Sequence, residues 1–410
     1  MLTTTFKKVL YFCILAFRKL LPAKPDKEAK IVLYPAFGSA SDLNDIIHRL
    51  DFYLPERDRF KIHFMVDCPS LFTDAEKIEF EKRGYLLTTL ESISGESVLL
   101  LVHKWRAIFS LRYLAKISSS YIIDKLFYWG VESLTLRDLF YNLISEKEKR
   151  RLGSKSLENF RRLSDKVAHL DESVLFLTGP SFEQYKNFEF KDQIKVVCNS
   201  IVKDEEFLDF IGGPDILTFA DPVFHFSPNK YSSEFRKDVR RLIRKYETYI
   251  FVPESTVPLL LSHIPEAEKY LIGVNCTKKI VFPSVSSGVA SKATGNILTF
   301  LMLPIASSFS KSVHIIGADG RGKSEKYFWR HNPKSQYGDK MNSVFEYHPS
   351  FFRDYDYSDY YRKHCKLLEK MIVYGERLGI KYLSLTKSHI PALKSREAGR
   401  IDSRSELSYE

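Results

Sequence analysis

The stretch SVLFLTGPS, from Ser173 to Ser181, decides the fold of this chain, because a short apolar run passes directly into a glycine-containing loop. The same change occurs at IKVVCNS (194–200), DILTFADP (215–222) and SVHIIGADG (312–320). Short apolar runs that end in turn residues are typical of buried parallel strands. In an open α/β sheet the carboxyl ends of such strands form the ligand crevice. We therefore expect an α/β protein whose nucleotide-type binding site is built from the second half of the chain.

The alternation of apolar runs with amphipathic segments predicts two Rossmann-like domains. A first domain is expected over 29–133, with strands near 30–34, 60–66 and 98–102 and helices near 42–53 (with Ser41 as its N-cap) and 74–84. A charged helical connector should cover 134–172. A second domain is expected over 173–394, with strands near 174–177, 194–198, 216–220, 249–252, 313–317 and 381–385 and a helix near 358–378. The polar segment 395–410 is expected to be disordered.

The net charge indicates which classes of partner to expect, and the cysteine pattern indicates the redox state of the compartment. The formal charge of +11 favours a negatively charged partner, such as an anionic lipid, a nucleic acid or a sugar nucleotide. No zinc-finger, RRM or helix-turn-helix signature is present, which argues against nucleic acid. The five cysteines form no C-x-x-C pair, so the pattern argues against a metal site or a disulfide framework and favours a reducing compartment.

The N-terminal segment carries a short apolar run between basic residues. Val9 to Phe17 is only nine residues long, too short to span a bilayer, and no small-residue cleavage site follows it. One interpretation is a basic amphipathic helix lying in the plane of an anionic membrane face. The other is a helix docked on the protein's own core or on a second subunit. We expect residues 1–28 to associate with the membrane, which predicts a cytoplasmic protein peripheral to the inner face of the cytoplasmic membrane.

Small and polar residues after the predicted strands are the candidates for nucleotide contacts. They are Thr178, Gly179, Pro180, Ser181, Asn199, Asp221, Asp319 and Arg321. Gly179 would let a ligand approach the backbone, and the hydroxyl and N–H of Ser181 could meet a phosphate or a ribose. Thr294, Gly295 and Asn296 open an apolar helical segment whose free N–H groups could face an anion, and Pro304 should bend that helix. The plainer alternative for each of these residues is an ordinary turn or helix cap.

Candidate catalytic residues lie further along the chain. His348, in the loop 346–349, is the candidate general base because histidine titrates near neutral pH, and His331 is the alternative base. Tyr327 and Tyr337 lie in a polar loop where their hydroxyls could cover a leaving phosphate. A hydrogen-bonded histidine and packed tyrosines are the plainer interpretations. No D-x-D pair follows a predicted strand, so we expect no metal ion in the mechanism.

The order of these motifs resembles that of the bacterial sialyltransferases of glycosyltransferase family 42 and related nonulosonate and Kdo transferases. The matching features are strand then Gly179-Pro180-Ser181, strand then Cys198-Asn199, Thr294-Gly295 before an apolar helix, strand then Gly317-Ala318-Asp319, the two tyrosines, and His348 before the final helix and strand. The resemblance covers about 170–393. This chain departs from the family pattern at Thr178, where the family has Asn or Gly, and in its added N-terminal domain.

The resemblance implies a metal-independent, inverting transfer from a CMP-activated sugar acid. The small-residue loops would hold CMP, Tyr327 and Tyr337 would stabilise the departing phosphate, and His348 would deprotonate the acceptor. A sialic acid-like donor and CMP-Kdo are equally compatible with the pattern. The acceptor would be a glycan or lipid-linked glycan of bacterial surface polysaccharide synthesis, gathered by the N-terminal domain of a GT-B-like protein, which could form a homo-oligomer. No cofactor beyond the donor is expected. The alternatives are a non-catalytic nucleotide-binding or scaffold protein of a polysaccharide assembly complex, and a transferase or pyrophosphokinase that uses another nucleotide.

Overall fold

The computed structural model describes residues 9, 12–13, 30–55, 61–66, 72–89, 98–109, 120–127, 131–321, 332–354 and 356–398. Most of the predicted membrane-associating segment, residues 1–28, lies outside the described residues. Of that segment only Val9, Phe12 and Cys13 are described, and their side chains are exposed. Tyr327 and His331 also lie outside the described residues. None of the described helices is both long enough and apolar enough to cross a bilayer.

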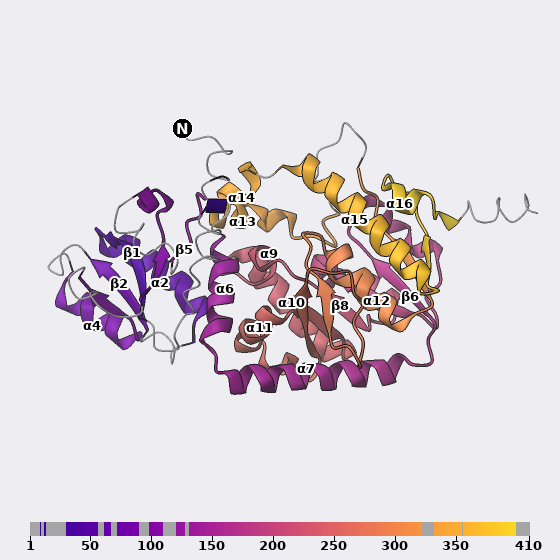
Figure 1. Ribbon diagram of the computed structural model, residues 1–410, viewed down its shortest axis with the longest axis horizontal. Helices are drawn as coiled ribbons and strands as arrows, with labels where there is room; N and C mark the ends of the chain where they lie inside the picture. Colours follow the sequence, from indigo (N-terminus) through magenta and orange to yellow (C-terminus); the bar gives the residue numbers. More distant parts are fainter. Residues whose placement is uncertain are drawn as a thin grey trace, which may run out of the picture. The chain divides into compact units, whose positions relative to one another are not determined.

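The chain divides into two compact units, and both are α/β, as predicted (Figure 1). Unit 1 comprises residues 1–145, 222–230 and 342–355, and unit 2 comprises 146–221, 231–341 and 356–410. The boundary after residue 145 falls inside the segment expected to connect the domains. Two short segments from the expected second domain, one of which contains His348, therefore belong to unit 1.

Unit 1 is built on a five-stranded parallel sheet of order β3-β2-β1-β4-β5. Its strands are β1 (Lys30–Phe37), β2 (Ile62–Val66), β3 (Leu86–Thr88), β4 (Val98–Val102) and β5 (Ser120–Ile122). Its helices are α2 (Ala40–Tyr53), α4 (Asp74–Lys82), α6 (Glu132–Leu143), α9 (Pro222–His225), α13 (Met341–Tyr347) and α14 (Pro349–Asp354). The predicted cap of α2 at Ser41 is wrong, because Ser39 accepts the hydrogen bond from the Asp42 N–H at 3.2 Å.

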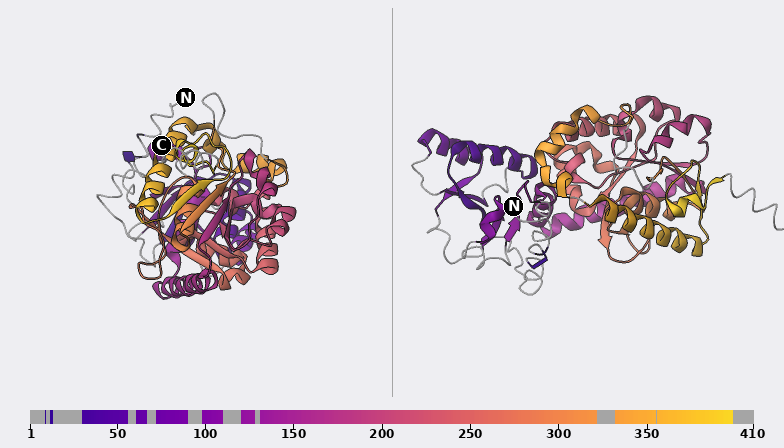
Figure 2. Two further views of the ribbon diagram at one scale, coloured as in Figure 1. Left: turned by 90° about the vertical axis from the view of Figure 1, so that its right-hand side faces the viewer. Right: turned by 90° about the horizontal axis from the view of Figure 1, so that it is seen from above.

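Unit 2 is built on an eight-stranded parallel sheet of order β11-β10-β9-β8-β7-β6-β12-β13, seen in the left view of Figure 2. Its strands are β6 (Glu172–Phe176), β7 (Ile194–Cys198), β8 (Ile216–Thr218), β9 (Tyr249–Pro253), β10 (Leu271–Thr277), β11 (Ala290–Lys292), β12 (Ser312–Ile316) and β13 (Lys381–Ser384). Six of these strands were predicted from sequence, and β10 and β11 were not.

The helices of unit 2 pack apolar stripes onto this sheet. The longer ones are α7 (Glu146–Val167), α10 (Lys230–Tyr246) and α15 (Tyr357–Arg377), and the shorter ones are α8 (Glu205–Phe210), α11 (Val257–His263), α12 (Leu303–Phe309) and α16 (Pro391–Lys394). Helix α7 is fixed to β10, because Asn159 donates to the Leu271 carbonyl at 2.9 Å and Ser156 accepts from the Gly273 N–H at 3.0 Å. These buried polar contacts fix α7, which lies in the segment expected to be a helical connector, to unit 2.

The polar segment expected to be disordered from residue 395 begins with ordered residues. The Ser384 N–H donates to the Arg396 carbonyl at 2.9 Å, and the Arg396 guanidinium pairs with Glu376 at 2.6 Å and Glu369 at 3.4 Å. Residues 395–398 therefore pack beside β13 and α15, and residues 399–410 lie outside the described part of the chain.

Candidate functional site at the carboxyl edge of the second sheet

The strand order of unit 2 contains a topological reversal beside β6. From β6 the chain adds β7 through β11 on one side, and it then returns to place β12 on the other side of β6. A reversal of this kind opens a crevice outside the carboxyl ends of the two central strands. The four loops singled out from the sequence follow β8, β7, β6 and β12, which are consecutive neighbours in the sheet. The structure therefore brings Asp221, Asn199, residues 178–181 and Asp319 to one edge.

The loops after β6 and β12 are packed against each other at their backbones. The Gly179 N–H donates to the Gly317 carbonyl at 2.9 Å. A Cβ at Gly179 would lie 2.1 Å from Asp319 Oδ2, and one at Gly317 would lie 2.2 Å from the Leu177 carbonyl oxygen. Gly317 also has a φ of +78°, a region that side chains other than glycine rarely adopt. Both positions therefore require glycine for a packing reason that holds without any ligand.

Asp319 closes the turn after β6. Its carboxylate accepts from the Ser181 N–H at 3.1 Å and from the Ser181 hydroxyl at 2.9 Å. Burial raises the pKa of Asp319, and the hydrogen bonds from Ser181 oppose that shift. The side chain is half-buried, so part of it remains exposed to solvent. A carboxylate thus occupies the position at this turn where a Rossmann fold usually receives a phosphate.

A fifth loop, which the sequence analysis did not single out, joins this edge after β13. The Thr386 hydroxyl lies 2.8 Å from the Ser181 hydroxyl, Ser388 donates to the Ala318 carbonyl at 2.7 Å, and the His389 N–H donates to the Asp319 carbonyl at 2.7 Å. The signal was present, because the apolar run before Thr386 ends in a polar Thr-Lys-Ser-His loop like the other four.

The start of α15 links two predicted site segments. The Tyr361 hydroxyl accepts from the Arg321 N–H at 3.2 Å, and the Arg321 guanidinium lies 5.2 Å from the centroid of the Tyr361 ring. The neighbouring Tyr360 donates its hydroxyl to the Gly295 carbonyl at 3.0 Å. The loops that carry Gly295 and Arg321 are therefore held by adjacent residues of one helix. Periodicity predicted this helix, but nothing in the sequence indicated that its first turns make these contacts.

Thr294, Gly295 and Asn296 open a π-helical segment, Leu298–Met302, which leads into α12. Asn296 caps it by accepting from the Leu298 N–H at 2.9 Å. Pro304 has no N–H to offer the Phe300 carbonyl four residues earlier, and the Ser291 hydroxyl donates to that carbonyl instead at 2.6 Å. A π turn, a feature frequent at functional sites, thus lies just before Pro304, and the bend expected at this proline stays a prediction.

His348 belongs to unit 1, whereas the strand-end loops belong to unit 2. It is 2% exposed, between α13 and α14, and the next turn is anchored by Ser350, whose hydroxyl donates to the Lys125 carbonyl at 2.7 Å. Burial lowers the pKa of His348 to about 4, helped by the positive charges of Arg49 and Lys125. The imidazole is therefore neutral at pH 7 and able to accept a proton, although as a weaker base than a free histidine.

Tyr337 is a packed residue of unit 2, only 3% exposed. Its hydroxyl donates to Asp238 of α10, and its ring lies 5.3 Å from the Lys203 ammonium and 5.0 Å from the Tyr231 ring. Burial and the neighbouring carboxylate raise the pKa of Tyr337. These contacts match the plainer interpretation of this tyrosine, because its hydroxyl is engaged with the protein.

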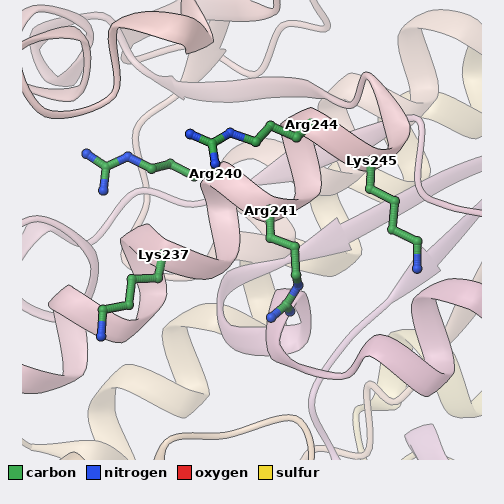
Figure 3. Close-up of a pocket in the computed structure, with 5 residues that line it drawn as sticks. All are labelled: Lys237, Arg240, Arg241, Arg244 and Lys245. Carbon is green, nitrogen blue, oxygen red and sulfur yellow. The ribbon is translucent and has the colours of Figure 1, made fainter.

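An open hollow of about 440 Å³ lies along α10, lined by Lys237, Arg240, Arg241, Arg244 and Lys245 (Figure 3). Acidic partners accompany these cations. Lys237 pairs with Glu234 at 2.8 Å, Arg241 with Asp238 at 2.7 Å and Glu205 at 2.9 Å, Arg244 with Glu266 at 3.4 Å, and Lys245 with Asp209 at 2.5 Å. Since carboxylates match the cations, this surface is a weaker candidate for an anion site than the strand-end loops.

Comparisons of the chain with protein-family models, with curated proteins and with solved structures returned no match. Within the described ranges, no group of three or more His, Cys, Asp or Glu side chains is arranged to hold a metal ion. The candidate site is therefore defined by its geometry: a parallel-sheet edge with a topological reversal, two glycines in tight contact with backbone or side-chain atoms, and a carboxylate and a guanidinium on one loop.

Proposed function

We propose that the chain is a glycosyltransferase that moves a sugar acid from a CMP-activated donor to a glycan or lipid-linked acceptor. The nucleotide would bind at the carboxyl edge of the sheet in unit 2. The observation that supports this most is the arrangement of the loops after β8, β7, β6 and β12, which follow neighbouring parallel strands on both sides of a topological reversal. The order of the motifs in these loops, which resembles family 42, favours CMP over other nucleotides.

The proposal assigns roles to the residues at this edge. Asn199, Asp221 and Thr178 would contact the nucleoside, and Arg321 would attract the phosphate of the donor, because a guanidinium pairs well with phosphate oxygens. Asn296 and the π turn would position the donor without a metal ion. His348 would be the general base, as the resemblance implies, in a GT-B-like protein with the acceptor bound by the N-terminal Rossmann-like unit.

Nucleotide binding tests this proposal. We expect the full-length chain to bind CMP in a calorimetric titration and to keep that affinity in EDTA, since the proposed mode of binding involves no metal ion. UMP, GMP and AMP serve as competitors. Binding of UMP or UDP alone, or binding only with manganese, would assign another donor. CMP binding without transfer from any CMP-sugar acid would favour the non-catalytic alternative.

A further inference from the structure

We propose that Asp319 orients the bound nucleotide so that a ribose hydroxyl, rather than the phosphate, contacts the turn after β6. This inference rests on the proposed function and deepens it by assigning an orientation to the ligand. It starts from the geometry of that turn, where Asp319 accepts from the Ser181 N–H at 3.1 Å and from its hydroxyl at 2.9 Å.

The first step concerns the hydrogen-bond donors of the turn. In most Rossmann-like folds the first strand-to-helix turn offers free N–H groups, and a phosphate accepts from them. Here the Ser181 N–H and hydroxyl already donate to a carboxylate of the same chain. A phosphate at this point would lack these donors and would also lie beside a like charge. The turn is therefore unsuited to the anionic end of a nucleotide.

The second step concerns what the carboxylate can still accept. A carboxylate has about four lone-pair positions, and Ser181 fills only part of this capacity. The Asp319 side chain is only half-buried, so a ligand bound at this edge can reach its carboxylate. Ribose hydroxyls are neutral donors, and a carboxylate in nucleotide-binding folds commonly accepts from them. The Asp319 carboxylate thus selects a hydroxyl-bearing sugar.

The third step places the phosphate. Arg321 follows Asp319 by two residues, and its guanidinium lies over the Tyr361 ring and donates to Ser358 at 3.1 Å. One loop at this edge therefore carries a carboxylate and, two residues later, a cation. A nucleoside monophosphate has the matching polarity, with neutral hydroxyls at the ribose and a negative charge beyond it.

The experiment compares ligands and variants by calorimetry on the full-length chain. Wild type should bind CMP roughly 10- to 100-fold more tightly than 2′,3′-dideoxy-CMP, the range expected for a hydrogen bond to a charged group. Asp319→Asn should weaken CMP and cytidine by similar factors and reduce that discrimination. Arg321→Gln should weaken CMP but leave cytidine unchanged. Asp215→Asn is the matched control, because Asp215 also accepts a backbone N–H, from Lys195 at 3.0 Å, but precedes β8 at the opposite edge.

Two results would overturn the orientation while leaving the proposed function intact. One is equal affinity of wild type for CMP and its dideoxy analogue, a measurement that needs no variant. The other is tighter binding of CMP by Asp319→Asn with cytidine unchanged, which would place the phosphate at Ser181. Absence of binding to CMP, UMP, GMP and AMP by the folded wild-type chain would instead overturn the proposed function, and the orientation with it.

Discussion

Gly317 shows how single residues shape the candidate site. Its φ is +78°, and a Cβ at this residue would lie 2.2 Å from the Leu177 carbonyl oxygen, so there is no room for a side chain. We expect Gly317→Ala to lower the free energy of unfolding of unit 2 by roughly 2–4 kcal/mol, from backbone strain and the displaced strand end together. Urea denaturation followed by circular dichroism measures this change.

Gly338→Ala is the control for that substitution, because no atom lies within 4 Å of the position its Cβ would take and its φ is not in the left-handed region. It should change the unfolding free energy by less than about 0.5 kcal/mol. Equal effects of the two substitutions would contradict the packing argument.

His348 offers a second test at the scale of one residue. If it is the base, His348→Ala should lower turnover by about 10²–10⁴-fold, the usual contribution of positioned proton transfer. CMP affinity should stay within about twofold, because removing a general base affects the transition state more than the ground state.

Steady-state kinetics and calorimetry on the same preparation separate these two effects. His331, which lies outside the described residues, is the rival base and should be replaced in parallel. If His331→Ala abolishes turnover and His348→Ala does not, the base is His331. Normal turnover in both variants would mean that the mechanism implied by the resemblance does not apply here.

At the scale of elements, the N-terminal segment is the clearest case for deletion. Val9 and Phe12 are 56% and 53% exposed, and basic residues flank this apolar run in the sequence. We expect a chain lacking residues 1–22 to stay folded and to lose sedimentation with vesicles rich in phosphatidylglycerol, since apolar insertion and charge attraction act together. Vesicles of neutral phosphatidylcholine are the control. Unchanged sedimentation of the shortened chain would mean that the membrane contact lies elsewhere in the chain or does not exist.

The elements of unit 2 show what sequence patterns can predict. The strands β6, β7, β8, β9, β12 and β13 were predictable because each is a short apolar run that ends in a polar loop. β11 was missed because three residues, Ala290–Lys292, carry no such pattern. β10 was missed because its second half is polar and largely exposed, with Asn275 and Cys276 facing solvent. In unit 1, β3 and β5 were missed for the same reason, because each is only three residues long.

The candidate site was predictable only in part. The loops were recognisable as strand ends, and their shared edge followed because the carboxyl ends of parallel strands lie at the same edge of a sheet. The hydrogen bonds of Asp319 with Ser181 did not follow, because they join residues 138 positions apart and depend on β12 lying beside β6. The placement of His348 in unit 1 was also beyond the sequence pattern, because local periodicity carries no information about which sheet a returning segment joins.

At the scale of the whole molecule, buried histidines couple stability to pH. Burial lowers the pKa of His103, His348 and His364 to about 4 each, against an ordinary value of 6.5. The folded state favours the neutral form of each histidine. Their contribution to the free energy of unfolding is therefore complete above pH 6.5 and is lost as the pH falls from 6.5 toward 4. For a fully buried histidine this loss is on the order of 2 kcal/mol between pH 7 and pH 5.

We therefore expect His348→Gln to reduce the acid-induced loss of unfolding free energy of unit 1 by on the order of 2 kcal/mol over that range. Urea denaturation at pH 7 and pH 5, followed by the fluorescence of Trp105 with Trp129 and Trp329 replaced by Phe, measures the difference. His48→Gln, at an exposed position of α2 in the same unit, is the matched control. A variant as acid-sensitive as wild type would contradict the burial argument.

The composition of unit 1 has a consequence for biosynthesis. Its sheet is complete by residue 122, but residues 222–230 and 342–355 also belong to unit 1, and the Ser350 hydroxyl donates to the Lys125 carbonyl. Domains usually fold in the order in which they leave the ribosome. Here the first unit to be translated is finished only when residue 355 has emerged, after most of the second. A nascent chain stopped at residue 145 would contain all five strands of the sheet but would lack residues 222–230 and 342–355. We expect such a fragment to depend on chaperones until these two segments have been translated.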